Sequence, residues 1–286
     1  YDTRSIQLVK ESIESGTAEG VTYAIELLDV FLSDQLKQRV IPILDDVSNN
    51  EKIKRLELFY PRVRLDEKLV LKFIINRDFT QSNRWTKACV LHQIGILKIE
   101  DFTLDLISQL FNPDQLIQET AAWALYQIDP QLYHSNSIRL GEDIKKSLDA
   151  AILGNGGDTT ILLYDKVLFL QRINLFEGIA GITLSYVADM SKNIFLKMNE
   201  KLPDTDQGKY FLLVYNGHVQ YFEFGQKVAD FQNGQFLGEQ LSEYEKMNLS
   251  AIIANEETIL LKFNKEEFYE LLSDQVKLAD KILEYI

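Results

Sequence analysis

Two side chains that could bind a metal ion, or act as a nucleophile with its base, lie three residues apart in this sequence. Cys89 and His92 would share one face of a helix. The chain has one cysteine and three histidines, so a zinc site would have to recruit carboxylates as further ligands. Both residues also flank an apolar stripe at helical spacing, which favours packing. We therefore expect Cys89 and His92 to be structural.

The remaining sequence predicts no catalytic activity. It contains no phosphate-binding loop, dinucleotide fingerprint, nucleophile elbow or metalloprotease helix. Lys and Arg number 30 against 43 Asp and Glu, which gives a net charge of −13. This charge disfavours nucleic acid as a partner, because phosphate binding needs clustered cations, and it disfavours an anionic membrane surface. We expect a protein that is not an enzyme and has no metal site.

Cysteine content and hydropathy indicate a cytoplasmic chain. A single cysteine excludes an internal disulfide and fits a reducing compartment. No apolar run approaches the roughly 18 residues of a membrane span, so we expect no insertion of this chain into a bilayer. The chain begins with Tyr1, and we expect it to be part of a longer protein.

The 286 residues predict two domains, divided by a Gly- and Asn-rich stretch at 154–158. Residues 1–154 carry apolar side chains at helical spacing, whereas residues 155–286 contain short aromatic and β-branched runs separated by glycine turns. The earlier helices are expected at about 5–14, 19–31, 33–45, 51–58 and 66–76.

An internal repeat of 34 residues marks the first part. Segment 84–94 aligns with segment 118–128 and repeats an apolar stripe: Ala88, Leu91 and Ile94 match Ala122, Leu125 and Ile128. Helix pairs with such a period are typical of stacked solenoids. Residues 5–150 therefore resemble HEAT-type repeats, and the resemblance implies an all-α scaffold or docking surface.

The second part alternates helices and strands. We expect an amphipathic helix over 159–176, a second helix near 180–190 and a return to strand over 251–263. Segment 210–224 predicts a hairpin of two strands about Asn216-Gly217, which is the strongest short hairpin signal. Residues 265–286 predict two amphipathic helices.

This order of elements resembles a cyclic nucleotide-binding domain over about 160–286. The resemblance is carried by the entry to the roll, the strand before Asn216-Gly217 and the later glycine turns, namely Leu175, Phe176, Gly178, Leu213, Gly217, Gly225 and Gly234. It implies an α+β fold in which a jelly-roll β-sheet, the β-roll, is flanked by helices. The predicted architecture is therefore a HEAT-like solenoid followed by this roll.

The resemblance also implies a phosphate-binding cassette. Gly238 and Glu239 match its start, where backbone amides hold the cyclic phosphate and Glu binds the ribose, and Gln240 follows them. Asn248 stands at the position of the family's phosphate-binding Arg, and Leu249 and Ser250 stand where the family has Ala.

The missing arginine predicts a degenerate cassette. A charge-assisted contact to phosphate contributes about 1.5–3 kcal/mol. Lys246 is the only cation within 235–254, and it lacks the bidentate fork of Arg. We expect no cofactor; cyclic AMP and cyclic GMP are the ligands that an active cassette would take.

We expect a non-catalytic regulatory or docking module that contacts a protein surface. Some bacterial transporters that resemble ATP/ADP translocases carry HEAT repeats and such a domain after their membrane part, so a transporter portion of the same polypeptide is an expected partner. The alternative is a genuine nucleotide sensor that binds through Gly238 and Glu239. Its phosphate site would be completed in trans by a residue such as Arg139.

Overall fold

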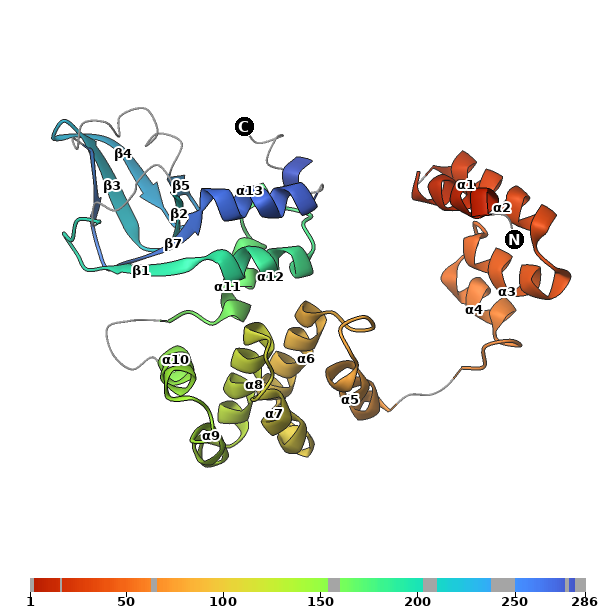
Figure 1. Cartoon of the computed structure of the whole chain (residues 1–286), viewed down its shortest axis with the longest axis horizontal. Helices are drawn as coiled ribbons and strands as arrows, with labels where there is room; N and C mark the ends of the chain where they lie inside the picture. The colour runs from red at the N-terminus through yellow and green to blue at the C-terminus, as the bar shows by residue number, and fades with distance from the viewer. Residues whose placement is uncertain are drawn as a thin grey trace. The chain divides into compact units, whose positions relative to one another are not determined.

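The computed structural model describes residues 3–15, 17–62, 66–153, 160–202, 210–237, 250–275 and 278–280. The chain divides into two compact units, Tyr1–Asp66 and Glu67–Ile286 (Figure 1). None of the described helices is both long and apolar enough to cross a membrane.

Short helices in a row form the described part of the first unit: α1 (Thr3–Glu14), α2 (Ala18–Phe31), α3 (Asp34–Leu44) and α4 (Asn49–Leu56). Their bounds agree with the ranges expected from the sequence to within two residues. Thr17 and Ser48 begin α2 and α4, because each side-chain oxygen accepts a backbone amide of the first turn.

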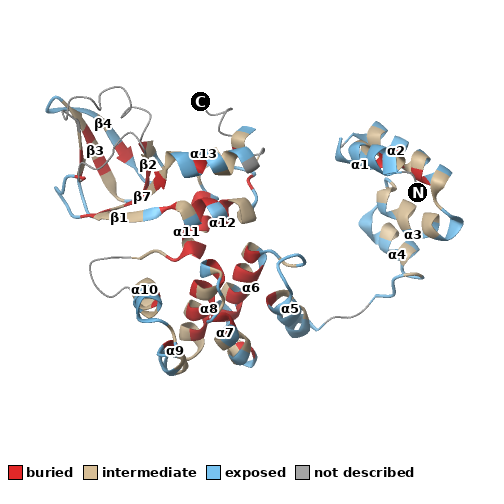
Figure 2. Cartoon of the chain, viewed as in Figure 1, coloured by how far each residue is buried: buried red, intermediate tan, exposed pale blue. Residues whose placement is uncertain are grey.

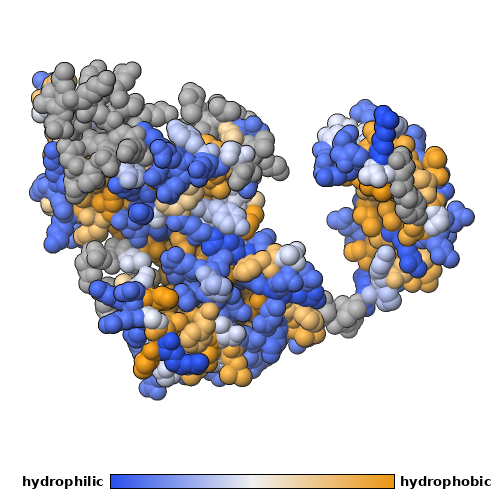
Figure 3. Space-filling view, viewed as in Figure 1, coloured by the Kyte–Doolittle hydropathy of each residue, from blue (hydrophilic) through white to orange (hydrophobic). Residues whose placement is uncertain are grey.

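Few of the described residues in the first unit are buried. Val9, Ala24 and Leu28 form its buried apolar cluster among the described residues. Large apolar side chains lie outside this cluster, and Val30 and Leu58 are 85% and 84% exposed. Apolar patches on this unit are visible in Figure 3.

The second unit begins with a group of helices that we call the helical layer. It comprises α5 (Glu67–Asn76), α6 (Arg84–Leu97), a 3-10 turn (Glu100–Phe102), α7 (Thr103–Gln109), α8 (Gln115–Ile128), α9 (Pro130–Ser137) and α10 (Glu142–Leu153). The two repeat copies coincide with α6 and α8, which pack against each other. Five of the six stripe residues are fully buried, and Ile128 is partly buried. The HEAT-like character of the layer stays a prediction.

Small residues let α6 and α8 approach closely. A Cβ added at Gly95 of α6 would lie 2.8 Å from the Ala124 Cα of α8 and 2.7 Å from the Trp123 ring. The repeat's alanines and this glycine therefore permit backbone contact that larger side chains would prevent.

Two helices connect the helical layer to the strands. These are α11 (Leu163–Leu170) and α12 (Gly181–Met190), with a 3-10 turn (Asn174–Phe176) between them. The single helix expected over 159–176 is therefore a shorter helix followed by this turn, whereas the helix near 180–190 is confirmed. Figure 2 shows buried residues concentrated on α6, α8, α11 and α12.

A single apolar core extends across the domain boundary expected between residues 154 and 155. The buried cluster that contains Leu91 and Leu125 of the helical layer also contains Val167 of α11, Val187 of α12 and Leu261 of a strand. The two compact units of the structure divide between Asp66 and Glu67. Polar residues at 154–158 indicated a boundary, but the helices on both sides of them share their apolar faces.

The described strands form two antiparallel sheets, which together we call the roll. One sheet has the order β1 (Lys192–Leu196), β7 (Thr258–Asn264), β2 (Tyr210–Asn216) and β5 (Phe236–Leu237). The other has the order β4 (Gln226–Gln232), β3 (His218–Glu223) and β6 (Ser250–Ala254). Leu212, Val214 and Val219 belong to the apolar cluster between them. An α+β region with this antiparallel roll is confirmed.

The predicted hairpin about Asn216-Gly217 is wrong in its pairing. Both strands exist, but β2 pairs with β5 and β7, whereas β3 pairs with β4 and β6. The chain changes sheet at Gly217, whose φ is +98° and whose missing Cβ leaves room for Thr258. The adjacent hairpin is β3–β4, where Phe224 and Gly225 both have positive φ.

After the roll, α13 (Lys265–Asp274) begins at Asn264, whose side chain accepts the amides of Glu266 and Glu267. Phe268 of α13 packs edge-on against Phe211 of β2, with ring centres 4.9 Å apart. A further short stretch of helix covers 278–280. The helix expected at the start of 265–286 is therefore confirmed.

Candidate functional site

Most of the predicted cassette lies outside the described residues. Gly238, Glu239, Gln240, Asn248 and Leu249 belong to the segment between β5 and β6, of which the structure describes nothing. Ser250 is the first residue of β6. The segment joins strands of the two sheets, since β5 ends at Leu237 in one sheet and β6 begins in the other.

Apolar side chains line the described interior of the roll. Leu202, Tyr221, Phe231 and Ile252 are buried between the sheets together with the residues named above. The Tyr221 hydroxyl donates to Glu223. Among the described strand residues no Arg or Lys is buried, so the described walls offer no cation to a phosphate group.

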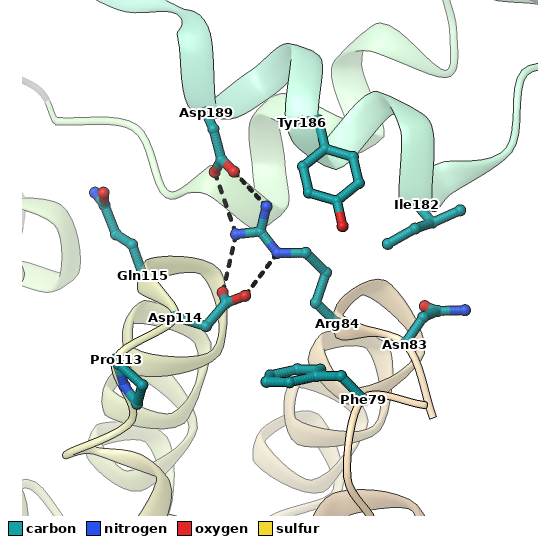
Figure 4. Close-up of a pocket in the computed structure, with 9 residues that line it drawn as sticks. All are labelled: Phe79, Asn83, Arg84, Pro113, Asp114, Gln115, Ile182, Tyr186 and Asp189. Carbon is teal, nitrogen blue, oxygen red and sulfur yellow. Dashed lines mark hydrogen bonds and ion pairs between the residues drawn. The ribbon is translucent and has the colours of Figure 1, made fainter. Parts of the chain in front are cut away.

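A guanidinium held by two carboxylates lies between the helical layer and α12 (Figure 4). Arg84 Nε lies 2.8 Å from Asp114 Oδ2, and Arg84 Nη2 donates to Asp114 Oδ1 at 2.9 Å. Arg84 also makes a bidentate contact with Asp189 of α12. Burial raises the pKa of the Asp189 carboxyl, and its hydrogen bond to Arg84 opposes that rise. Three elements are joined by this one side chain.

Local sequence explains why these three side chains meet. Arg84 is the first residue of α6 after its cap Asn83, and Asp114 caps α8, so the starts of two parallel-packed helices bring them together. Asp189 stands one residue before the end of α12, on the side facing the layer.

A second buried polar group connects α8 with α11. The Glu119 carboxylate accepts the Leu163 backbone amide at 2.8 Å and the Gln115 amide at 2.7 Å. Lys166 donates to the Ser191 hydroxyl at 3.0 Å. Burial lowers the pKa of Lys166 to about 8, against the attraction of Glu119, and burial raises the pKa of Glu119. These contacts fix the angle at which α11 leaves the layer.

Four aromatic rings stack across the same interface. Trp85 lies on Tyr164 with centres 5.1 Å apart, Tyr164 lies on His92 at 4.0 Å, and His92 lies on Trp123 at 4.4 Å. Burial lowers the pKa of His92. Both tryptophans of the chain therefore report on the packing of α11 against the helical layer.

The same stack accounts for Cys89 and His92. Burial raises the pKa of the Cys89 thiol, and a hydrogen bond with Tyr164 opposes that rise. The described residues contain no group of three or more His, Cys, Asp or Glu that could hold a metal ion. The structural role expected for both residues agrees with their contacts, since His92 is inserted between two rings.

α12 contacts two partners at once. On one side the Trp85 ring lies against Gly181, where an added Cβ would be 2.1 Å from Trp85 Nε1. On the other side Thr183 Oγ1 donates to Gln275 Oε1 at the end of α13, at 3.1 Å. Figure 1 shows α12 between α13 and the helical layer. α12 thus lies in contact with both α6 and the end of α13.

Three further polar residues also have structural neighbours. His134 lies in α9 beside Tyr126 and Tyr133. His218 begins β3 and contacts Asp230 at 3.0 Å. The Arg139 guanidinium lies over the Phe111 ring at 4.9 Å.

Sequence reasoning missed the five charged residues of the interface: Arg84, Asp114, Glu119, Lys166 and Asp189. A signal for two of them was present. Lys166 is the only cation in the apolar segment 161–170, and Glu119 precedes an alanine-rich apolar run. A charge inside or directly beside such an apolar run indicates a buried, partnered group.

Comparisons with solved structures find partial likenesses. The N-terminal domain of a transcriptional regulator from Streptomyces coelicolor is 18% identical, over 40% of this chain and 86% of that chain, with a TM-score of 0.34. A cyclic nucleotide-binding domain from Methylobacillus flagellatus is 20% identical, over 42% and 71%, with a TM-score of 0.35. The sensor domain of the regulator DNR from Pseudomonas aeruginosa is 16% identical, over 43% and 87%, with a TM-score of 0.37.

No family model matches the chain, and no curated protein matches it. The solved structures similar to it thus include cyclic nucleotide-binding domains, over about two fifths of its length.

Proposed function

We propose that residues 67–286 are a non-catalytic regulatory module, in which the roll sets the position of the helical layer through α12. The observation that carries this proposal is the double contact of α12. Asp189 and Gly181 bind it to α6, and Thr183 binds it to the end of α13. Because protein interiors are close-packed, we expect a shift of one of these helices to displace the helices packed against it.

In this proposal the roll positions the helical layer without a bound nucleotide. Asn248 stands where the resemblance implies a phosphate-binding Arg, and Arg172 is the only Arg between Gly141 and Ile286. The described roll interior is apolar. A cyclic phosphate would therefore enter an acidic chain without a bidentate partner.

The partner in this proposal is a protein surface, which includes a further part of the same polypeptide. Nucleic acid is disfavoured by the net charge of −13. The exposed apolar side chains of the first unit, such as Val30 and Leu58, are of the type that protein contacts cover.

Thermal unfolding with millimolar cyclic AMP, cyclic GMP, AMP and ATP tests the proposal. A ligand at about 100 times its dissociation constant adds about 2.7 kcal/mol and moves the midpoint by several degrees. We expect no shift with any of the four. A shift that Glu239→Ala abolishes would contradict a nucleotide-free roll and favour a sensor that binds through Gly238 and Glu239. Ser242→Ala, in the same segment, is the control.

A further inference from the structure

A pocket of about 580 Å³ opens beside the Arg84 guanidinium, between the starts of α6 and α8 and the outer side of α12. Figure 4 shows Tyr186, Ile182 and Asp189 reaching it from α12, and Phe79 and Pro113 from the opposite side. Its size falls within the roughly 300–1,000 Å³ of small-molecule sites, and its lining joins aromatic faces to a few polar groups.

The two carboxylates of the pocket share one ion-pair partner. Asp114 and Asp189 share the single guanidinium of Arg84. The Arg84 side chain is 8% exposed, whereas those of Asp114 and Asp189 are 18% and 33% exposed, so carboxylate oxygens are the charged atoms that the opening presents. Buried charges are normally paired, and a second cation would give each carboxylate an ion-pair partner of its own.

Two further cations near the pocket, Lys87 and Lys166, make their hydrogen bonds elsewhere. Lys87 is buried, donates to the Arg77 carbonyl and lies 4.5 Å from the centre of the Phe79 ring. Asp78 and Asp114 both attract its charge, but neither forms an ion pair with it. Lys166 attracts Asp189 from a greater distance and donates to Ser191 instead. Arg84 is thus the ion-pair partner of both carboxylates among the described residues.

Aromatic side chains flank the carboxylates. Tyr186 is 42% exposed and Phe79 is 49% exposed, although each already has one cation near its ring. Ring faces beside a carboxylate pair attract organic cations, because the quadrupole of the ring is negative on its face.

An anion is disfavoured even though two helices begin here. The Asn83 side chain accepts the Thr86 amide at 2.9 Å, and Asp114 accepts the Ile117 amide at 3.3 Å. Capping side chains thus take up amides that an anion would need, and Arg84 is already bound on both edges of its fork.

We propose that this pocket binds an organic cation, namely a guanidinium or alkylammonium group on an apolar body. The cationic head contacts Asp189 and Asp114, and the apolar part lies against Tyr186 and Phe79. The two carboxylates that share one guanidinium, together with the flanking rings, carry the inference, which does not depend on whether the roll binds a nucleotide.

Isothermal titration calorimetry at low ionic strength tests this with the whole chain and two probes. Agmatine presents the head as a free small molecule, and a capped tripeptide with a central arginine presents it on a polypeptide. Pentanoate, of similar size and opposite charge, is the control ligand. We expect saturable binding of at least one cationic probe and none of pentanoate. The cationic probe that binds more tightly shows whether the ligand is a free small molecule or part of a polypeptide. Either result supports the proposal.

Matched variants locate the binding. Asp189→Asn keeps the shape but removes a charge, and we expect it to weaken binding at least about tenfold. Tyr186→Leu replaces an exposed ring and should weaken binding about 2- to 30-fold without unfolding the chain. Asp143→Asn, on the exposed start of α10, removes the same charge elsewhere and should change nothing.

Three results would overturn the proposal. One is the lack of saturable binding of both cationic probes to the wild-type chain at millimolar concentration. Another is binding of pentanoate as tight as that of agmatine. The third is cation binding that neither Asp189→Asn nor Tyr186→Leu weakens.

Discussion

Arg84 connects residues that lie up to 105 positions apart in the sequence, because it binds Asp114, the cap of α8, and Asp189 in the last turn of α12. Truncating it would leave two carboxylates at a largely buried position without their partner. We expect Arg84→Ala to lower the free energy of unfolding by about 2–4 kcal/mol in urea titrations, slightly less than for a fully buried pair. Arg172→Ala, at an exposed position, should cost less than about 0.5 kcal/mol. Equal effects of the two substitutions would contradict the assigned role of Arg84.

Lys166 gives the interface a defined pH dependence. Burial lowers its folded-state pKa to about 8 from 10.5, so between these values the unfolded chain binds more protons. Stability contributed at this position therefore rises with pH through that window. We expect the free energy of unfolding of wild type, relative to Lys166→Met, to increase by about 2 kcal/mol from pH 7 to 9.5.

The comparison with Lys166→Met removes other titrations. Burial raises the pKa of Tyr164 to about 12 and that of Cys89 above its usual value, and both contribute the opposite slope. These groups are present in both proteins, so their effects cancel in the difference. A difference that stays flat over the range would show that Lys166 is not buried as described.

At the scale of residues, the sequence did not predict which charged side chains pair with one another across the interface. The packing role of His92 followed from its position beside a stripe, which is local information. The Arg84–Asp189 contact depends on how α12 lies on the helical layer, and no local pattern encodes that placement. The cassette residues predicted from the resemblance stay predictions: Gly238, Glu239, Gln240, Asn248, Leu249 and Ser250.

At the scale of elements, the contact of α12 with α6 depends on Gly181. A methyl group there would lie 2.1 Å from Trp85 Nε1 and 2.4 Å from its Cδ1, so the indole must move. We expect Gly181→Ala to cost about 1–3 kcal/mol in urea unfolding and to shift tryptophan emission to longer wavelength. Gly141→Ala, with nothing within 4 Å of the added methyl, should cost less than about 1 kcal/mol, because Gly141 only caps α10, and should leave the emission unchanged. Unchanged emission for Gly181→Ala would contradict the contact.

The two glycine corners of the roll allow a matched comparison. Gly217 and Gly225 both have positive φ, but an added Cβ meets Thr258 Oγ1 at 2.5 Å only at Gly217. We expect Gly225→Ala to cost about 1–2 kcal/mol from backbone strain alone. Gly217→Ala should cost a further 1–3 kcal/mol or so from overpacking, measured by urea unfolding. Similar costs would show that the sheet change at Gly217 is not tightly packed.

The sequence predicted the positions of helices and strands better than it predicted which strands pair. Helical periodicity placed α1 to α6 within a few residues, and glycine turns separated the strands. Asn216-Gly217 nevertheless predicted a hairpin, because the signal reports a tight turn and not which strands pair after it. In the structure the turn carries the chain to the second sheet, since β2 and β3 bury their side chains in one apolar cluster from opposite sides.

At the scale of the whole molecule, composition indicated two parts but not the position of their division. Residues 154–158 are polar and glycine-rich, yet the helices before and after them share a core. Leu91 and Leu125 of the helical layer are buried in one cluster with Val167 of α11 and Val187 of α12. If α11 and α12 were removed, the helices of 67–153 would therefore expose apolar surface. The account therefore requires the helical layer and the roll to unfold together.

The most direct test is urea unfolding of the whole chain, followed at the same time by tryptophan emission and by hydrogen exchange of amides in β2 and β7. Trp85 and Trp123 report on the helical layer, whereas the strand amides report on the roll. Coincident transitions are the signature of one cooperative unit. The account predicts one shared midpoint, which Asp189→Asn lowers equally for both probes. Two separate midpoints, with Asp189→Asn moving only one, would contradict the coupling through α12.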